Sequence, residues 1–345
     1  MLTIDPESIE TAAAERAFTG VVTVDSADER IFERARGFAH RAFEVPNTVD
    51  TQFGIASGSK AFTALAIMRL VEDGALSLET RARQILGTDL PEIDDAVTIE
   101  HLLTHTSGIG DYLDEEAEWE PSDYVLAAPV HTLTTAEAFL PLVDGFPQSF
   151  TPGERWAYCN GSYIVLAIIL ERVTVEVYHD IVRRLVFAPA GLGSTDFLRT
   201  DELPGTAALG YLFDEGDRVN TLNLPVLGNG DGGAFTTAAD LHRFWRALFA
   251  GKIVSPAAVA EMVRPRHVPD QGMRCGMGFF LHATAPAVLI EGYDAGVSFQ
   301  SAHLPASATT ASVLGNSSEG AWPVVRVVTD AIDRLAADAG GDAGV

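Results

Sequence analysis

The pattern of hydrophobic and polar residues along the chain predicts both helices and strands. Residues 61–71 are apolar on nearly every side of a helix, which is typical of a buried helix, and Gly74 is placed to end it. Further helices are expected over 98–105, 162–173, 238–249, where Thr237 is the N-cap, and 324–337. Runs with the period of a strand occupy 18–24, 29–39, 277–282, 287–291, 297–304 and 310–314.

Strands at both ends of the chain, with helices between them, predict an α+β fold. We expect residues 1–85 and 266–345 to form one region around an antiparallel sheet. Residues 86–265 would form a mainly helical insertion, and the active site would lie between the two regions. The sequence shows no internal repeat.

The composition of the chain limits the classes of partner that the protein can bind. The chain has 345 residues, of which 47% are hydrophobic, so it can bury a large core. It carries 48 acidic and 23 basic residues, a net charge of −25. Such a surface repels phosphate groups, and we therefore expect no nucleic-acid partner and no membrane partner.

The two cysteines are too few for a disulfide framework, and the first residues lack the basic and apolar segments of an export signal. The sequence therefore favours a cytoplasmic protein. The alternative is an exported chain whose signal has already been removed. The sequence leaves the oligomeric state open.

The first candidate for chemistry is Ser57, which is followed three residues later by Lys60. This spacing puts the amine on the same helical face as the hydroxyl. A lysine at the head of an apolar helix is a better base than usual, because burial lowers its pKa. A chance match is the alternative, but chance does not explain a lysine whose neighbours are apolar.

The second candidate is Tyr158, with Asn160 two residues further on. A phenol close to an ammonium group can act as a general base or acid, and an asparagine offers a hydrogen-bond donor and an acceptor. Alone this pair is a weak signal, since a tyrosine at the end of a loop is common. Its value comes from its combination with Ser57 and Lys60.

With these motifs the chain resembles the serine β-lactamases of class C, the penicillin-binding DD-peptidases and the related esterases. The resemblance covers most of the chain and is carried by residues 53–64, 101–109, 152–160 and 232–241. It implies that fold, an antiparallel sheet flanked by terminal helices plus a helical region. It also implies that Ser57 is the acylated nucleophile, Lys60 its activating partner and Tyr158 the general base, with Asn160 touching the substrate or the lysine.

The resemblance weakens at the third family motif, a strand that usually carries a cation for a substrate carboxylate. Residues 290–296 are the best match, and they put Glu291 where the cation is expected. A carboxylate there would repel the carboxylate of a penicillin. Pairing with an arginine or a different register are the other interpretations of Glu291. The family pattern further implies that the backbone N–H of Asp294 completes the oxyanion hole with that of Ser57.

We therefore predict a serine hydrolase, an esterase or amidase acting on small neutral or cationic acyl substrates without a cofactor. The acidic segment 111–123, with Tyr112, is a candidate substrate-selecting lid. Alternatives are a DD-peptidase or β-lactamase-like enzyme that holds the carboxylate with Arg274 or Arg155, a transacylase, and a non-catalytic sensor. His101 and His105 are spaced like metal ligands, but no glutamate lies between them, and we predict no metal site.

Overall fold

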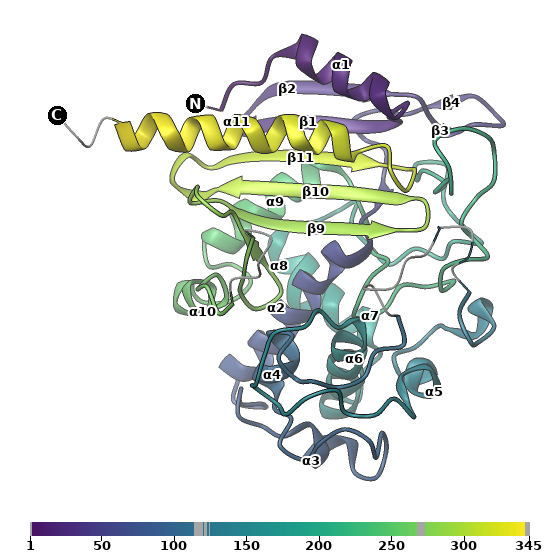
Figure 1. Ribbon diagram of the computed structural model, residues 1–345, viewed down its shortest axis with the longest axis vertical. Coiled ribbons are helices and arrows are strands. Elements are labelled where there is room, and N and C mark those ends of the chain that lie inside the picture. The colour runs from purple at the N-terminus through teal and green to yellow at the C-terminus, as the bar shows by residue number, and fades with distance from the viewer. Residues whose placement is uncertain (1, 114–119, 121–122, 124, 268–272, 342–345) are drawn as a thin grey trace.

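A seven-stranded antiparallel sheet organises the computed structural model, which describes residues 2–113, 120, 123, 125–267 and 273–341. The strand order is β2-β1-β11-β10-β9-β8-β7, so an N-terminal hairpin is joined to C-terminal strands through β1 and β11 (Figure 1). The strands are β1 (Gly20–Ser26), β2 (Glu29–Arg36), β7 (Arg274–Cys275), β8 (Phe280–Leu281), β9 (Val288–Asp294), β10 (Val297–Leu304) and β11 (Thr309–Gly315). The predicted α+β class and antiparallel sheet are confirmed.

Two terminal helices, α1 (Pro6–Glu15) and α11 (Trp322–Gly341), cover one face of this sheet (Figure 1). The hydrophobic pattern did not reveal α1, although its start has a clear signal. Asp5 caps the helix by accepting from the backbone N–H groups of Glu7 and Ser8, each at 3.2 Å. Pro6 stands at the first helical position, where its missing N–H costs nothing.

The other face of the sheet is covered by α9 (Ala238–Phe249), which packs against β1 and β11. This helix has the ends that the sequence predicted, and Thr237 caps it by accepting from the N–H of Asp240 at 3.2 Å. The buried Trp245 donates from Nε1 to Ser301 Oγ in β10 at 2.9 Å. Although α9 belongs to the segment predicted as the helical insertion, it thus forms a layer on the sheet.

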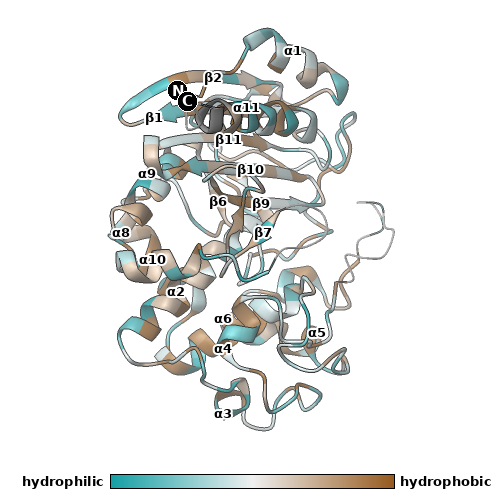
Figure 2. Ribbon diagram, turned by 60° about the vertical axis from the view of Figure 1, so that its left-hand side comes forward, coloured by the Kyte–Doolittle hydropathy of each residue, from teal (hydrophilic) through white to brown (hydrophobic). Residues whose placement is uncertain are grey.

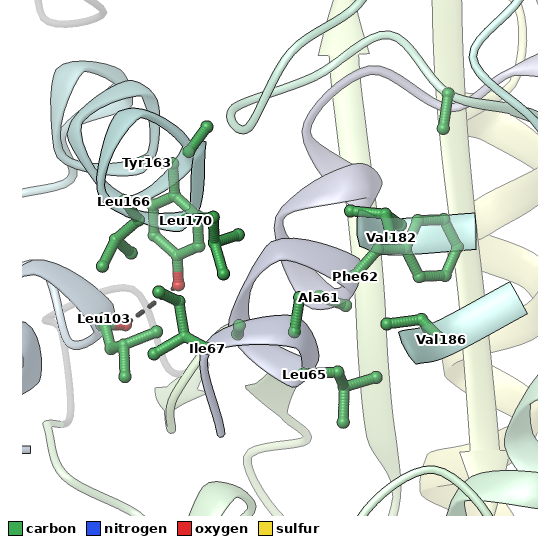
Figure 3. Packing of buried hydrophobic residues seen from close by; sticks show 14 of the residues in the cluster. Ala61, Phe62, Leu65, Ile67, Leu103, Tyr163, Leu166, Leu170, Val182 and Val186 are labelled. Carbon is green, nitrogen blue, oxygen red and sulfur yellow. Dashed lines mark hydrogen bonds between the residues drawn. The ribbon is translucent and has the colours of Figure 1, made fainter. Parts of the chain in front are cut away.

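Below the sheet lies an apolar helical layer built on α2 (Lys60–Glu72) and α6 (Asn160–Thr174), both buried along most of their length (Figures 1 and 2). Phe62 of α2 makes edge-on ring contacts with Phe187 and Phe244, with centroids 5.0 and 5.3 Å apart. The hydroxyl of Tyr163 in α6 donates to the carbonyl of Leu103 at 2.9 Å (Figure 3). These contacts hold α2 against the segment of Phe187 and against α9, and α6 against the segment of Leu103, while α2 and α6 also pack on each other.

Short elements complete the fold. The short strands are β3 (Phe38–His40), β4 (Val45–Pro46), β5 (Phe53–Gly54) and β6 (Phe235–Thr236). The short helices include η1 (Ala56–Ser59), α3 (Ala82–Leu86), α4 (Ile99–Leu103), α5 (Leu140–Val143), α7 (Tyr178–Val182), η5 (Arg183–Phe187), α8 (Ala188–Ala190) and α10 (Pro256–Met262). Within the described part of the chain, no helix is long and apolar enough to span a membrane.

Candidate active site

Ser57 lies in η1, at the junction between the sheet and the helical layer. The 3₁₀ turn η1 leads directly into α2 and packs against β9. The approach is so close that a side chain at Gly292 of β9 would lie 2.1 Å from the carbonyl oxygen of Ile55 and 2.9 Å from the nitrogen of Ser57. Only glycine fits at this position, and the backbone around Ser57 is thereby held against the sheet.

Lys60 begins α2, and its ammonium nitrogen is surrounded by three oxygens. Nζ lies 2.9 Å from Ser57 Oγ, 2.7 Å from Asn160 Oδ1 and 2.7 Å from the carbonyl oxygen of Asp231. The amide oxygen and the carbonyl can only accept, so they take two N–H groups of the amine. The third position on Lys60 Nζ is directed at Ser57 Oγ. It holds an N–H in the ammonium form and a lone pair in the neutral amine.

Asn160 is held in place by Asp111. The two carboxylate oxygens of Asp111 accept from the backbone N–H of Asn160 at 2.6 Å and of Gly161 at 2.9 Å, at the N-terminus of α6. Burial raises the pKa of Asp111, and these hydrogen bonds and the charge of Lys60 oppose the rise. From the sequence alone, Asp111 could be placed only in the acidic segment 111–123. Its partner, the N-terminus of α6, lies 49 residues later, and no local pattern predicts that contact.

The ring of Tyr158 lies next to Lys60 and stacks on the ring of His105. Lys60 Nζ is 5.0 Å from the centroid of the Tyr158 ring, which stacks on His105 with centroids 4.5 Å apart. The buried Nδ1 of His105 accepts from the backbone N–H of Cys159 at 3.1 Å. Burial and then the charge of Lys60 lower the pKa of His105 to about 3, so this ring is neutral and supports Tyr158.

Asp231, which the sequence analysis did not select, lies on the other side of Lys60. Its carbonyl binds the lysine, and its carboxyl oxygen Oδ2 accepts from the hydroxyl of Tyr112 at 2.5 Å. Burial raises the pKa of Asp231, and the charge of Lys60 opposes this effect. The rest of the predicted lid lies mostly outside the described residues.

The pairing of β9 with β10 bears on the predicted oxyanion hole. Asp294 pairs with Val297 across a turn of two residues, and residues that flank such a turn exchange their backbone hydrogen bonds. The N–H of Asp294 is therefore directed at Val297. The N–H of its neighbour, Tyr293, points to the opposite edge of β9, and Tyr293 follows Gly292, which adjoins Ser57.

Glu291 is paired with a glutamine. Its Oε2 accepts from Gln300 Nε2 of β10 at 2.7 Å, and burial raises the pKa of its carboxyl group. Because side chains alternate along a strand, Glu291 points to the opposite face of the sheet from the one that η1 covers at Gly292. It still lines a cavity next to Ser57, where β8 no longer pairs with β9.

Ser57 lies between two cavities of different character. The first, which we call the apolar cavity, is lined by Lys60 and Glu291 and by Tyr158, Tyr163, Cys275, Phe279, Phe280 and Ile290. The second, which we call the polar cavity for its amide and carboxyl side chains, is lined by Tyr112, Asn160, Asn220, Asn229, Asp231, Tyr293 and Asp294, and also by the apolar Leu113, Leu224, Pro225, Phe235 and Val297. A carbonyl group placed at Ser57 would therefore extend into two different environments.

The two arginines considered as carboxylate holders are engaged elsewhere. Arg274 donates to the carbonyl of His282 at 3.1 and 2.6 Å, and the Arg155 guanidinium lies 4.3 Å from the centroid of the Phe150 ring. His101, the other half of the histidine pair, accepts from the N–H of Thr98 at 3.3 Å. Across the described ranges, no three His, Cys, Asp or Glu side chains are grouped so that they could hold a metal.

Comparison with known proteins gives a family and a fold. A family model described as Beta-lactamase matches residues 7–327. The crystal structure of a penicillin-binding protein from Bacillus halodurans is 35% identical, with a TM-score of 0.86 over 95% of this chain and 99% of that one. Esterase EstB from Burkholderia gladioli is 32% identical over 206 residues, which are 55% of this chain and 50% of the esterase.

A D-aminopeptidase from Brucella anthropi is 30% identical over 271 residues, 77% of this chain and 49% of that protein. The chain thus spans about half to two-thirds of the length of the curated relatives it matches first.

Proposed function

The chain belongs to the Beta-lactamase family, and from this premise we propose that it is a serine hydrolase that cleaves carboxylic ester or amide bonds through an acyl-enzyme. The observation that carries the proposal is the position of Lys60 Nζ, 2.9 Å from Ser57 Oγ, with two fixed acceptors on its remaining sides. A serine needs such a partner, because its hydroxyl is a weak nucleophile unless its proton is removed.

The reaction proceeds in two steps. Ser57 Oγ attacks the carbonyl carbon while its single proton passes to the Lys60–Tyr158 pair, to the amine if Lys60 is neutral or to the phenolate oxygen if Tyr158 is ionised, and the carbonyl oxygen becomes an oxyanion between the N–H groups of Ser57 and Tyr293. The leaving group then departs with that proton. Water attacks the acyl-enzyme in the same way, giving the acid and restoring the hydroxyl of Ser57.

Neutral or cationic substrates are favoured over those with a carboxylate. Apart from Lys60 and the neutral His105, no described residue lining either cavity is basic, and Glu291, Asp231 and Asp294 are acidic. Arg155 and Arg274 do not line the cavities. The relatives named esterase and D-aminopeptidase support activity on ester or amide bonds. The second candidate is a DD-peptidase-like activity, which the 35% identity to a penicillin-binding protein favours.

The mass of the intact protein after exposure to a p-nitrophenyl ester, and separately to a penicillin, tests the proposal. We expect turnover or an acyl adduct with the ester in the wild type and neither in Ser57→Ala. A stronger reaction with penicillin would favour the second candidate. No adduct and no turnover with either reagent would contradict a hydrolase and favour a non-catalytic sensor.

A further inference from the structure

One edge of the seven-stranded sheet is formed by β2. This strand stands at the end of the strand order, with β1 as its neighbour (Figure 1). Among the described residues, the backbone of residues 29–35 makes no hydrogen bond other than those with β1. The outward N–H and C=O groups of such an edge are a template for a further strand, and the side chains of the edge determine which strand fits.

The side chains of β2 are complementary to the same strand running in the opposite direction. Residues 29–34 read Glu-Arg-Ile-Phe-Glu-Arg, so an antiparallel copy places each arginine opposite a glutamate. Opposite charges that face each other on neighbouring strands are favourable, whereas like charges are not. Across a two-fold axis between two copies, the paired residues are Glu29 and Arg34, Arg30 and Glu33, and Ile31 and Phe32.

A β-bulge puts the paired side chains on the same face of the sheet. Side chains alternate along a regular strand, so Glu29 and Arg34, five residues apart, would point to opposite faces. In β2 the register against β1 shifts between Phe32 and Arg30, and Ile31 is the extra residue. The alternation is therefore reversed once between the two halves of the strand.

The contacts of β2 agree with these faces. The residues of β1 that lie opposite Glu29 and Arg34 are four positions apart, so these two side chains share one face. Arg30 donates to Glu33 at 3.2 Å, which places this second pair together on the other face. The strand thus matches its own copy on both faces of the sheet.

The charges also select one register. A shift of the second copy by one residue would place Glu29 opposite Glu33 in one direction, or Arg30 opposite Arg34 in the other. Charged side chains on an edge usually prevent pairing, because a foreign strand leaves them without opposite charges. A second copy of β2 supplies those charges, and it also covers Ile31, which is 40% exposed.

We propose that two copies of this protein associate through β2, in an antiparallel arrangement that joins their two sheets across a two-fold axis. Glu10 of α1 contacts Arg34 and Arg36 near one end of β2, so the axis places the two copies of α1 at opposite ends of the interface. Because the ion pairs are exposed to solvent, each contributes little, and the dimer forms at micromolar concentrations and weakens as salt rises.

The interface is separate from the catalytic serine. Ser57 lies in η1, which packs against β9, and three strands, β1, β11 and β10, stand between β9 and β2. Both copies of the candidate active site therefore stay open in the dimer. The inference does not depend on the proposed hydrolase function.

Sedimentation equilibrium of the full chain over the micromolar range tests the proposal. We expect a monomer–dimer equilibrium in the wild type, with a dissociation constant about tenfold higher in about 1 M salt than at low salt. Glu29→Arg should abolish the dimer, because it places like charges opposite each other at both ends of the interface. Glu92→Arg, at an exposed position outside the sheet, is the matched control. A monomeric wild type, or a dimer that persists in Glu29→Arg, would overturn the proposal.

A charge swap tests the pairing of the two side chains. Glu29→Arg combined with Arg34→Glu restores opposite charges across the axis, and it should restore the dimer that Glu29→Arg alone loses. A swapped variant that folds, as measured by circular dichroism, and yet stays monomeric would contradict the pairing of Glu29 with Arg34.

A cross-link tests the register without any change of charge balance between copies. Glu29→Cys combined with Arg34→Cys should give a disulfide-linked dimer on oxidation, because paired residues on neighbouring strands have Cα atoms about 4.5–5.5 Å apart. Within one strand the same two positions are about 16 Å apart and cannot be bridged. The native Cys159 and Cys275 are buried. A double variant that does not cross-link, or Glu29→Cys alone that does, would overturn this register.

Ester turnover separates the interface from catalysis. The monomeric Glu29→Arg variant should keep the kcat/KM of the wild type, and a lower value would contradict an interface remote from Ser57. A wild type that dimerises through β2 but hydrolyses no ester or amide would count against the proposed function and support this interface.

Discussion

The two cavities beside Ser57 differ in chemistry because they are built from different parts of the chain. The apolar cavity is walled by residues of the sheet edge, such as Phe280 and Ile290, whose neighbours are already in the core. The polar cavity is walled by loops that carry Asp231 and Asn229 and by the turn after β9. Burying apolar surface of a substrate increases its affinity but does little to fix its orientation. Polar side chains that are held by hydrogen bonds select a substrate by its charge and by the position of its polar groups. The reactivity of Ser57 and the selectivity of the two cavities for substrate can therefore change separately in this protein.

Lys60→Met is expected to have the largest effect, because Lys60 contacts Ser57, which lines both cavities. Loss of the amine next to Ser57 should reduce kcat/KM by about a thousandfold for an ester and an anilide alike. Parallel steady-state measurements on the two substrates check this. Survival of one activity would mean that the two cavities do not share one reaction centre.

Asp111→Ala is expected to come next, with kcat lower by about 10- to 100-fold, because Asn160 would no longer be held against Lys60. Asp111→Asn, which keeps one acceptor oxygen, should retain more activity than the alanine variant. A purely structural role would lower Tm but leave the pH profile of kcat unchanged, so a shifted profile distinguishes a positioning residue.

Phe280→Ala should affect only the apolar side. We expect KM for a substrate with a bulky aromatic group to rise by about tenfold, with KM for a small aliphatic ester unchanged, since the Phe280 side chain lines only the apolar cavity. Leu222→Ala, at a side chain that is 83% exposed, is the matched control. An equal rise in KM for the small ester would show that Phe280 does not act through the apolar cavity alone.

Glu291→Gln should have the smallest effect, one on stability. Burial raises the pKa of Glu291, so the folded state holds this proton more tightly than the unfolded state. The contribution of the side chain to stability is therefore largest at acid pH and declines as pH rises through the folded pKa. Because glutamine cannot ionise and can still accept from Gln300, the stability of the variant relative to wild type should increase from acid to neutral pH.

Urea unfolding at several pH values measures the free energy of unfolding of the variant and of the wild type. Glu215→Gln, at an exposed position, is the control for the loss of one carboxylate. A relative stability that falls with rising pH would contradict the buried, proton-retaining state of Glu291.

The parts of the fold and site that sequence could predict are those set by neighbours in the chain. The Ser57–Lys60 spacing within one turn of helix, the Thr237 cap and the span of β10 all depend on local pattern. Asp111 and Asp231 were missed as site residues because each meets its partners only after folding, across 49 and 171 positions. The local pattern does not determine which N–H group would complete the oxyanion hole, because the turn after β9 decides which N–H groups of that strand pair with β10.

The close packing of Gly292 against η1 also governs when the protein can act. Ser57 and Lys60 leave the ribosome before their partners do, because Asn160 and Asp231 lie 100 and 171 positions after Lys60, and β9 follows both. A nascent chain therefore carries its nucleophile long before it has the groups that position it, and non-local pairing of this kind forms late in folding. The serine of a growing chain therefore stays unreactive until β9 has been synthesised and has packed against η1.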